Sequence, residues 1–379
     1  MSRRRFLALF SWACVVASAS LLLSPAVFHA APQSSGYRII RNVPLNSDGQ
    51  YDYVTVDPEA RLVYVPRNTH IQVINGDTGK IVADIPDMSG LHGVAVAPEF
   101  NRGFVTGNEG TPPPTGGGPP IAVIYLLDTK AMKVSGKLTP AGAKGADGLI
   151  YDSATKRAFI NMGASNNVEV VDGATGQLVG TVTLPGRPEI ASPDGKGSVF
   201  VNIVDKNLVV EYDGKSLAIK NTWPVPCDRP YGNAIDRTHR LLFIGCRGKL
   251  NTLESDNKMV IMSADTGKVI TTVPLGVGTD GIAFDQSTGI VYVTCRDDGR
   301  NGLGGVTNVF HEEAPDKYAK LADVKTIYGS RTNGLDTKTH HIFTVGTEKN
   351  EPPPPPDKAM PNGGPRQTMS SLVLEEIGK

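Results

Sequence analysis

The sequence predicts an all-β fold, a seven-bladed β-propeller, because a unit of about 40 residues recurs seven times along the chain. Each copy holds four short runs rich in β-branched and aromatic residues, separated by turn signals, and no helix-period segment of useful length interrupts them. Four strands in each of seven copies are the pattern of a propeller in which every copy forms one blade. Gly and Pro are frequent, at 42 and 28 residues, as expected for short strands joined by tight turns.

The first copy shows how the unit is built. Its inner strand, 53–57, ends on Asp57, and a tight turn leads into an apolar second strand, 62–65. An alternating third strand, 71–74, then reaches the Asp77-Thr78-Gly79-Lys80 turn before the last strand. The residue that ends the inner strand in the seven copies is Asp57, Ala97, Asp152, Asp194, Asp236, Asp285 and Asp336.

The ends of the repeat array predict how the ring closes. The seventh copy finishes with the strand 371–374 and lacks an outermost strand, whereas 37–40 forms a strand that belongs to no copy. We expect this N-terminal strand to complete the last blade, which would leave no exposed strand edge and tie the termini together. Residues 37–379 are therefore expected to form a single propeller domain.

The first 31 residues have the features of an export signal. Three arginines precede an apolar stretch, 6–23, and small residues follow around Ala30. A transmembrane anchor is the alternative, but serines interrupt the stretch and no basic stop follows it. Residues 2–7 resemble the twin-arginine motif, with an ordinary signal as the other reading. We expect a periplasmic or secreted, monomeric protein with no membrane span once the signal is removed.

Charge and cysteine content restrict the classes of function. The 38 basic residues balance the 38 acidic ones, which argues against a protein held mainly by nucleic-acid phosphates. Beyond the signal, the chain has Cys227, Cys246 and Cys295, an odd number for an oxidising compartment. One disulfide and one free thiol are expected, with Cys227–Cys246 as the first pairing and Cys246–Cys295 as the second.

The repeat resembles the YVTN-type family of exported propellers. Tyr292-Val293-Thr294-Cys295 is similar to the signature strand of that family, and so is 104–107. The Asp-Thr-Gly-Lys turns that begin at Asp77 and Asp265 are also typical of it. The resemblance extends over nearly all of the chain after the signal. It implies the fold and no particular reaction, because the family is defined by its repeat.

One mouth of the central channel is the predicted site, because inner strands enter the channel from one face. The residues five positions before the end of each inner strand should meet there, with Pro188 or Glu189 in the fourth copy. Carboxylates and one imidazole suit Ca²⁺, Mg²⁺ or Mn²⁺. The candidate metal ligands are Asp52, His92, Asp147, Glu189 and Asp280.

Basic and polar residues of the same face form a second candidate group. Guanidinium groups pair bidentately with carboxylates and phosphates, so these residues suit an anionic ligand. The alternative for both groups is that channel mouths are wet and attract polar side chains for that reason. The candidate ligand-binding residues are Arg67, Asn108, Arg187, Arg229, Tyr231, Arg247, Arg296 and Arg331.

Long insertions and histidines distinguish the two faces. Four insertions follow second strands and so belong to the mouth face: 111–120, 249–257, 297–305 and 351–367. Loops are tolerant of insertion and are also where binding residues gather. His239, His340 and His341 fall in turns of the opposite face, where we expect them to be solvated.

No catalytic motif marks the chain as an enzyme. The sequence has no G-x-S-x-G elbow, H-E-x-x-H motif, Walker A loop or EF-hand loop. The leading prediction is an exported binding protein that recognises a small molecule, a polymer or a protein at the mouth. The alternative is a metal-dependent lactonase-like or lyase-like enzyme, since propellers of the gluconolactonase and streptogramin-lyase types hold a divalent ion at the channel mouth. Whether the chain is an enzyme stays open at this point, and no cofactor is certain.

Overall fold

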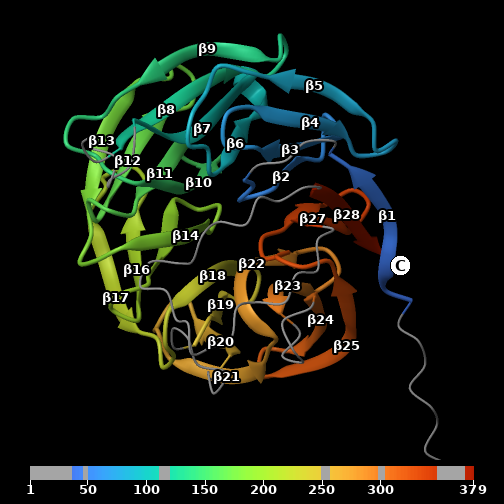
Figure 1. Cartoon of the computed structure of the whole chain (residues 1–379). Coiled ribbons are helices and arrows are strands. Elements are labelled where there is room, and N and C mark those ends of the chain that lie inside the picture. Colours follow the sequence, from blue (N-terminus) through green and yellow to red (C-terminus); the bar gives the residue numbers. More distant parts are fainter. Residues whose placement is uncertain (1–35, 46–49, 111–119, 249–256, 298–303, 348–371) are drawn as a thin grey trace, which may run out of the picture. The chain divides into compact units, whose positions relative to one another are not determined.

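Seven four-stranded antiparallel sheets stand around a common centre (Figure 1). The computed structural model describes residues 36–45, 50–110, 120–248, 257–297, 304–347 and 372–379, all within the compact unit Ser35–Lys379. In six of the sheets the first strand in chain order lies toward the centre, and the last lies at the rim (Figure 1). The predicted seven-bladed propeller is confirmed, while the predicted signal, 1–31, lies outside the described residues.

In blades one to six, the strands run from the centre outward in chain order. Blade one contains β2 (Thr55–Asp57), β3 (Leu62–Pro66), β4 (Ile71–Asn75) and β5 (Ile81–Ile85). Blade two contains β6 (Val94–Ala97), β7 (Arg102–Glu109), β8 (Ile121–Asp128) and β9 (Lys133–Leu138). Blade three contains β10 (Ala146–Asp152), β11 (Arg157–Met162), β12 (Asn167–Asp172) and β13 (Leu178–Thr183). Blades four and five contain β14 (Pro188–Pro193), β15 (Ser198–Ile203), β16 (Leu208–Asp213) and β17 (Ile219–Pro224); and β18 (Pro230–Asp236), β19 (Leu241–Cys246), β20 (Lys258–Ser263) and β21 (Val269–Pro274). Blade six contains β22 (Val277–Asp285), β23 (Ile290–Asp297), β24 (Gly305–Ala314) and β25 (Lys317–Thr326). The described residues include one helical element, the 3-10 turn η1 (Pro98–Phe100) in blade two.

The seventh blade combines the two ends of the propeller. It contains β26 (Gly334–Asp336), β27 (His341–Thr347), β28 (Leu372–Gly378) and β1 (Arg38–Pro44). Strand β1 pairs antiparallel with β28, from Arg38 opposite Gly378 to Pro44 opposite Val373. The predicted closure by the N-terminal strand is therefore confirmed, and the edge of β28 is covered.

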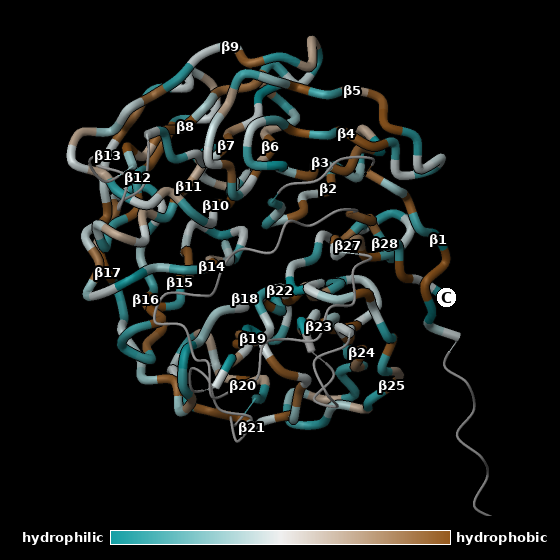
Figure 2. Tube along the Cα trace, in the orientation of Figure 1, coloured by the Kyte–Doolittle hydropathy of each residue, from teal (hydrophilic) through white to brown (hydrophobic). Residues whose placement is uncertain are grey.

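The hydrophobic core lies between blades rather than at the centre of the ring. Seven buried clusters each join two neighbouring blades, one cluster at each junction. At the closing junction, Val63 of blade one packs in the same cluster as Phe343 of blade seven. Apolar segments accordingly occur in every blade instead of gathering on one side (Figure 2). Because the second strands are buried on both faces, they read as continuous apolar runs.

The aspartate that ends an inner strand organises the turn that follows it. The Oδ1 atom of Asp57 accepts hydrogen bonds from the backbone N–H groups of Glu59 and Ala60, at 3.1 and 3.0 Å. This side-chain cap explains why Asp recurs at the position, since its short carboxylate bonds the backbone two and three residues on. The same turn recurs at Asp152, Asp236, Asp285 and Asp336.

Basic side chains four residues after these aspartates join neighbouring blades at the face opposite the mouth. Arg61 of blade one pairs with Asp336 of blade seven, and both belong to such turns. Arg240 of blade five lies 2.8 Å from Asp194 of blade four. His340 of blade seven lies 2.7 Å from Asp285 of blade six. Each of these three side chains reaches back to the carboxylate of the preceding blade.

The three histidines of this face are therefore not merely solvated, and that expectation is corrected. His239, His340 and His341 each have Nδ1 within 2.8 Å of a carboxylate oxygen, on Asp236, Asp285 and Glu376 respectively. A turn histidine that a sequence places at the surface is close enough to its own or a neighbouring blade to pair with a buried acid.

Candidate functional site at the channel mouth

Residues at the start of all seven inner strands meet at one mouth of the channel. Neighbouring blades are joined there by ion pairs: Arg331 to Asp52, Asp52 to His92, and Asp280 to Arg331. The chain of contacts continues from His92 to Asp147. In the fourth blade the residue at this position is Glu189 rather than Pro188. The residues five positions before the end of each inner strand thus converge, as the repeat indicates. Their location at the mouth does not by itself assign them a role.

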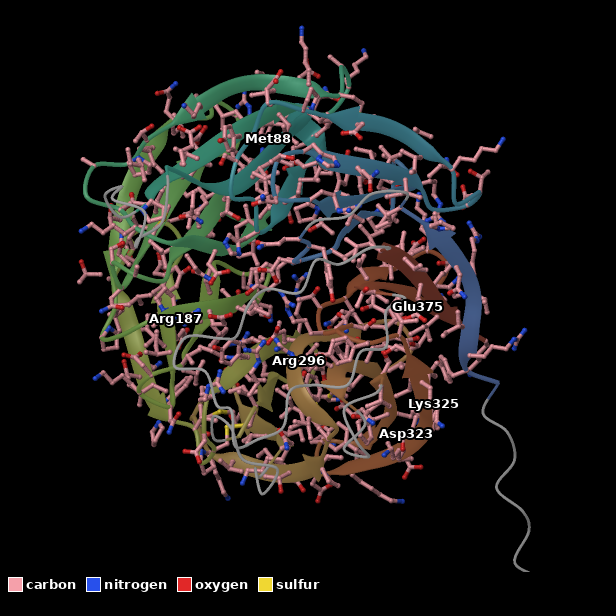
Figure 3. All side chains as sticks on the ribbon, in the orientation of Figure 1. Met88, Arg187, Arg296, Asp323, Lys325 and Glu375 are labelled. Atoms are coloured by element: carbon pink, nitrogen blue, oxygen red, sulfur yellow. A yellow bond between two sulfur atoms is a disulfide. The ribbon has the colours of Figure 1, made fainter. Side chains whose placement is uncertain are left out.

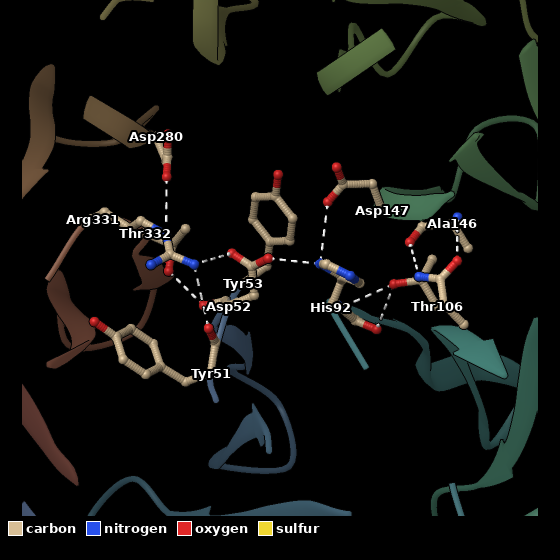
Figure 4. A network of polar contacts seen from close by, with 12 residues as sticks. Tyr51, Asp52, Tyr53, His92, Thr106, Ala146, Asp147, Asp280, Arg331 and Thr332 are labelled. Carbon is tan, nitrogen blue, oxygen red and sulfur yellow. Dashed lines mark hydrogen bonds and ion pairs between the residues drawn. The ribbon is translucent and has the colours of Figure 1, made fainter. Parts of the chain in front are cut away.

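An acidic side of this mouth centres on His92. Its Nδ1 atom lies 2.8 Å from Oδ2 of Asp52 and 3.5 Å from Oδ1 of Asp147, so one imidazole joins three blades (Figure 4). One donor atom from each of these three residues lies within 4.8 Å of the other two. These are the atoms that could hold a divalent cation. Glu189 and Asp280 of the predicted ligand set are not part of this group of three.

Glu189 is held by a side chain from across the channel. The Tyr53 hydroxyl of blade one donates a hydrogen bond to Oε1 of Glu189 in blade four, at 3.0 Å. Arg187 lies 3.3 Å from Oε2 of Glu189 and 3.5 Å from Asp147. The Glu189 side chain is only 5% exposed, whereas that of Arg187 is 44% exposed. The arginine therefore covers a buried carboxylate and keeps part of its own guanidinium in solvent.

A basic side of the mouth surrounds Asp280. Arg247 pairs with Oδ1 of Asp280, while Arg331 and Arg296 lie 3.1 and 3.6 Å from Oδ2. The carboxylate is 5% exposed, and it faces three guanidinium groups. Arg296 is the outermost of the three, with 45% of its side chain exposed (labelled in Figure 3). One buried negative charge thus balances only part of the positive charge around it.

Two tyrosines support the arginines from their ring faces. The Arg247 guanidinium lies 3.7 Å from the ring centroid of Tyr231, and that of Arg229 lies 5.1 Å from the same ring. Arg331 lies 5.4 Å from the centroid of Tyr51. Such cation–π contacts hold a guanidinium in place while leaving its N–H groups free for anions. Tyr231 and Arg229 are accordingly in the basic side, as the repeat predicts.

The charges of the acidic side are strongly coupled. Burial alone would raise the pKa of Asp52, but Arg331 and His92 outweigh it and lower that pKa. Burial and the negative charge of Asp52 raise the pKa of Asp147, and burial with the charge of Asp147 raises that of Glu189 well above its usual range. For His92, burial opposes protonation, yet Asp52 and Asp147 raise its pKa overall. Three of these four shifts move this side toward positive charge.

The arginines of the basic side differ in how well they are neutralised. Burial would lower the pKa of Arg331, but Asp52 raises it overall. For Arg247, Asp280 likewise outweighs burial and raises the pKa. Partial burial, then repulsion from Arg247, lowers the pKa of Arg296 to about 10, despite the opposing charge of Asp280. Arg296 therefore carries the positive charge that lacks a full counter-charge.

Two predicted ligand-binding residues make contacts within the scaffold. Arg67 is 1% exposed, and its Nη1 atom donates to Oε1 of Gln72 at 2.6 Å, so it is not on a surface that a ligand reaches. Asn108 of blade two uses its amide on the backbone of Ala146 in blade three, donating at 2.8 Å and accepting at 3.0 Å. Arg67 is therefore a correction to the predicted set, because a strand end at the mouth face can turn its side chain inward, while a role of Asn108 in binding stays a prediction.

The repeat count missed two residues of the mouth, Tyr51 and Tyr53. They flank Asp52 in the sequence, and each reaches a different blade: the Tyr51 hydroxyl donates to the carbonyl of Gly329 at 2.5 Å, and Tyr53 reaches Glu189. The prediction takes one position per blade, five residues before the end of the inner strand. It therefore does not include the residues on either side of that position. The aromatic residues on both sides of Asp52 are the signal that could have found them.

The channel below the mouth is narrow and closed to large ligands. A cavity of about 140 Å³ lies among inner-strand residues of six blades, with Tyr53, Leu149 and Ile282 in its lining. Its lining is mostly small or apolar, and it is too small for more than a few solvent molecules. A ligand of the mouth would therefore bind at the surface formed by the two charged sides, above this cavity.

The cysteines are also at this end of blades five and six. Cys227 and Cys246 form a disulfide with a Cα–Cα distance of 6.0 Å (yellow bond in Figure 3), which is the first of the two expected pairings. Cys295 is a free, fully buried thiol, and burial raises its pKa to about 12. The disulfide joins the segment before β18 to the end of β19. Most of the four predicted insertions lies outside the described residues.

Among the residues that the structure describes, no helix has both the length and the apolar composition to cross a bilayer.

No protein-family profile matches the chain, and no curated protein matches it. Solved structures do match. The structure described as U3-55K has a TM-score of 0.67 at 10% identity and covers 91% of this chain and 99% of its own. The RRP9 WD40 repeats have a TM-score of 0.67 at 10% identity, covering 92% and 99%. Kuenenia stuttgartiensis hydrazine synthase has a TM-score of 0.62 at 13% identity, covering 77% and 91%. At these identities the chain shares a β-propeller fold with them, and the likeness extends to the fold alone.

Proposed function

We propose that this chain is an exported binding propeller whose channel mouth recognises an anionic group, carried by a small molecule, a polymer or a protein. The observation that supports it is the excess of guanidinium groups around Asp280. Three arginines share that carboxylate, and the outermost, Arg296, has 45% of its side chain in solvent. A carboxylate or phosphate group would supply the missing counter-charge with bidentate hydrogen bonds.

The acidic side favours the same conclusion. The raised pKa values of Asp147, Glu189 and His92 each favour the protonated form of these groups. Both sides of the mouth are thereby made more compatible with an anion. Export and membership of the YVTN-type group rest on the N-terminal segment and the repeat, and both belong to this proposal.

Thermal unfolding in the presence of simple anions tests the proposal. Inorganic phosphate and succinate serve as probes, because a ligand that binds only the folded state raises its stability by RT ln(1 + [L]/Kd), or about 1.4 kcal/mol at ten times Kd. We expect at least one probe to raise the unfolding temperature of the wild type and to lose most of that effect in Arg296→Gln. Arg38→Gln is the matched control, since Arg38 is on the outermost strand and donates to the carbonyl of Gly36. Equal effects of the probes on wild type and Arg296→Gln contradict the proposal.

A second candidate function is metal-dependent catalysis at Asp52, His92 and Asp147. Its support is that one donor atom of each residue lies within 4.8 Å of the others. Two carboxylates and an imidazole are also ligand types that bind divalent cations. The ion would polarise an ester or acid bound beside it. Arg331 and the pKa of His92 both oppose a cation there, so we rank it second. Metal content of the purified chain, compared with His92→Ala, decides: no stoichiometric metal in the wild type eliminates this candidate.

A further inference from the structure

The face opposite the mouth carries a second group of metal-ligating side chains, which is independent of the proposed function. This group lies on the same face as the inter-blade ion pairs described above. At three junctions, the residue four positions after the inner-strand aspartate reaches back to the aspartate of the preceding blade, as Arg61, Arg240 and His340 do. All three adopt positive φ, between 58° and 62°, which aims their side chains at that neighbour.

The junction of blades five and six departs from this series. The corresponding residue of blade six is Gly289, with φ of 67°, so the backbone keeps the turn but offers no side chain. Among the described residues, Asp236 of blade five forms no ion pair with an arginine or a lysine. A second carboxylate is present instead, because Glu312 on β24 of blade six packs beside Gly289 and donates its backbone N–H to the Gly289 carbonyl, at 2.9 Å.

In the part of the chain that the structure describes, one side chain, that of His239, pairs with both acids. The Nδ1 atom of His239 lies 2.6 Å from Oδ2 of Asp236 and 3.1 Å from Oε1 of Glu312. A single N–H cannot donate well to both oxygens, and neither oxygen of Glu312 has a hydrogen-bond partner of good geometry. Glu312 is 9% exposed and Asp236 is 2% exposed. Two buried carboxylates thus share one imidazole, whereas each of three other junctions has one basic side chain for one buried carboxylate.

We propose that a divalent cation binds between Asp236, His239 and Glu312, in the place that a basic side chain takes at three other junctions. One donor atom of each residue lies within 4.8 Å of the other two, a spacing that a cation held at about 2.0–2.6 Å from each donor requires. Two carboxylates and an imidazole suit Mn²⁺ or Zn²⁺. The His239 side chain is 53% exposed, so solvent reaches the site and water completes the coordination. The cation would fasten blade five to blade six.

Mn²⁺ binding to the full chain tests this site. The chain is stripped with EDTA, and thermal unfolding and the EPR signal of Mn²⁺ are recorded with and without MnCl₂. We expect Mn²⁺ to raise the unfolding temperature of the wild type. Glu312→Gln and His239→Gln should each lose that increase and at least tenfold in Mn²⁺ affinity. Glu312→Gln should also unfold no earlier than the wild type without metal, because it removes a buried, poorly compensated charge.

Two control variants separate this site from the rest of the chain. His340→Ala changes the corresponding pair at the next junction, so it should lower the baseline unfolding temperature and keep the Mn²⁺ increase. His92→Ala alters the mouth and should keep it as well. The proposal is overturned if Mn²⁺ does not raise the unfolding temperature of the wild type. It is overturned equally if Glu312→Gln retains the increase or if His92→Ala abolishes it.

Discussion

The hydroxyl of Tyr53 in blade one donates a hydrogen bond to Glu189 in blade four, 3.0 Å away, and so spans the mouth of the channel. In a ring of seven blades these two are far apart in order, and no strand pairing joins them. The contact therefore links opposite parts of the ring directly. It also supplies one of the few donors available to a carboxylate that is 5% exposed.

Tyr53→Phe should destabilise the fold by about 1–3 kcal/mol, because it leaves a buried acceptor of Glu189 without its donor. Urea unfolding of the two proteins at neutral pH measures the difference. Tyr151→Phe is the matched control: its hydroxyl donates to Glu99, an exposed carboxylate that water can solvate, so less than about 1 kcal/mol is expected. Equal losses of unfolding free energy in the two variants would show that the Tyr53–Glu189 hydrogen bond stabilises the fold no more than an exposed one does.

The stability that His92 contributes should depend on pH. Its pKa is raised in the fold by Asp52 and Asp147, against burial and the charge of Arg331. A raised folded-state pKa means that the contribution is fully present below the unfolded-state pKa, about 6.5, and is lost as pH rises through the folded-state value. The difference in unfolding free energy between wild type and His92→Gln should therefore be largest below about pH 6.5 and shrink as the pH rises above it.

Proton NMR titration of the His92 ring checks the cause of that dependence. In Asp52→Asn the His92 pKa should fall, because the hydrogen-bonded carboxylate that favours the imidazolium is gone. A difference between wild type and His92→Gln that grows with pH would contradict the assignment, as would an unchanged His92 pKa in Asp52→Asn.

The disulfide should stabilise the mouth end of blade five. Cys227 and Cys246 are 19 residues apart, and closing a loop of that length in the unfolded chain corresponds to about 3 kcal/mol. Urea unfolding with and without a reductant should show a loss of that size in the wild type. The loss should persist in Cys295→Ala, whose thiol is free, and vanish in Cys227→Ser with Cys246→Ser. A reductant effect that disappears in Cys295→Ala would assign the bond to a different pair.

The repeat predicts the ring and the seven inner positions because each blade uses the same register, so equivalent residues come to equivalent places. The direction of the side chains at the ends of the second strands is not repeated in the same way. Arg67 follows the end of β3, but its side chain is buried against Gln72, and Asn108 bonds the backbone of the next blade. Contacts between non-equivalent positions, such as Tyr53 with Glu189, depend on the closed ring and have no periodic signal.

Arg61→Ala and Lys156→Ala test whether the inter-blade cations matter for stability. Both residues are four positions after the inner-strand aspartate of their blade, with φ of 60°. Arg61 reaches Asp336, whose side chain is 1% exposed, whereas blade two offers Lys156 only Ala97 at the corresponding place. Removing Arg61 leaves a buried carboxylate without its charged partner and should cost about 1–3 kcal/mol. Removing Lys156, which lies over the Phe100 ring at 5.9 Å, should cost less than about 1 kcal/mol. Urea unfolding of both variants measures the difference, and similar losses would mean that the cation acts through its turn rather than through the aspartate of the neighbouring blade.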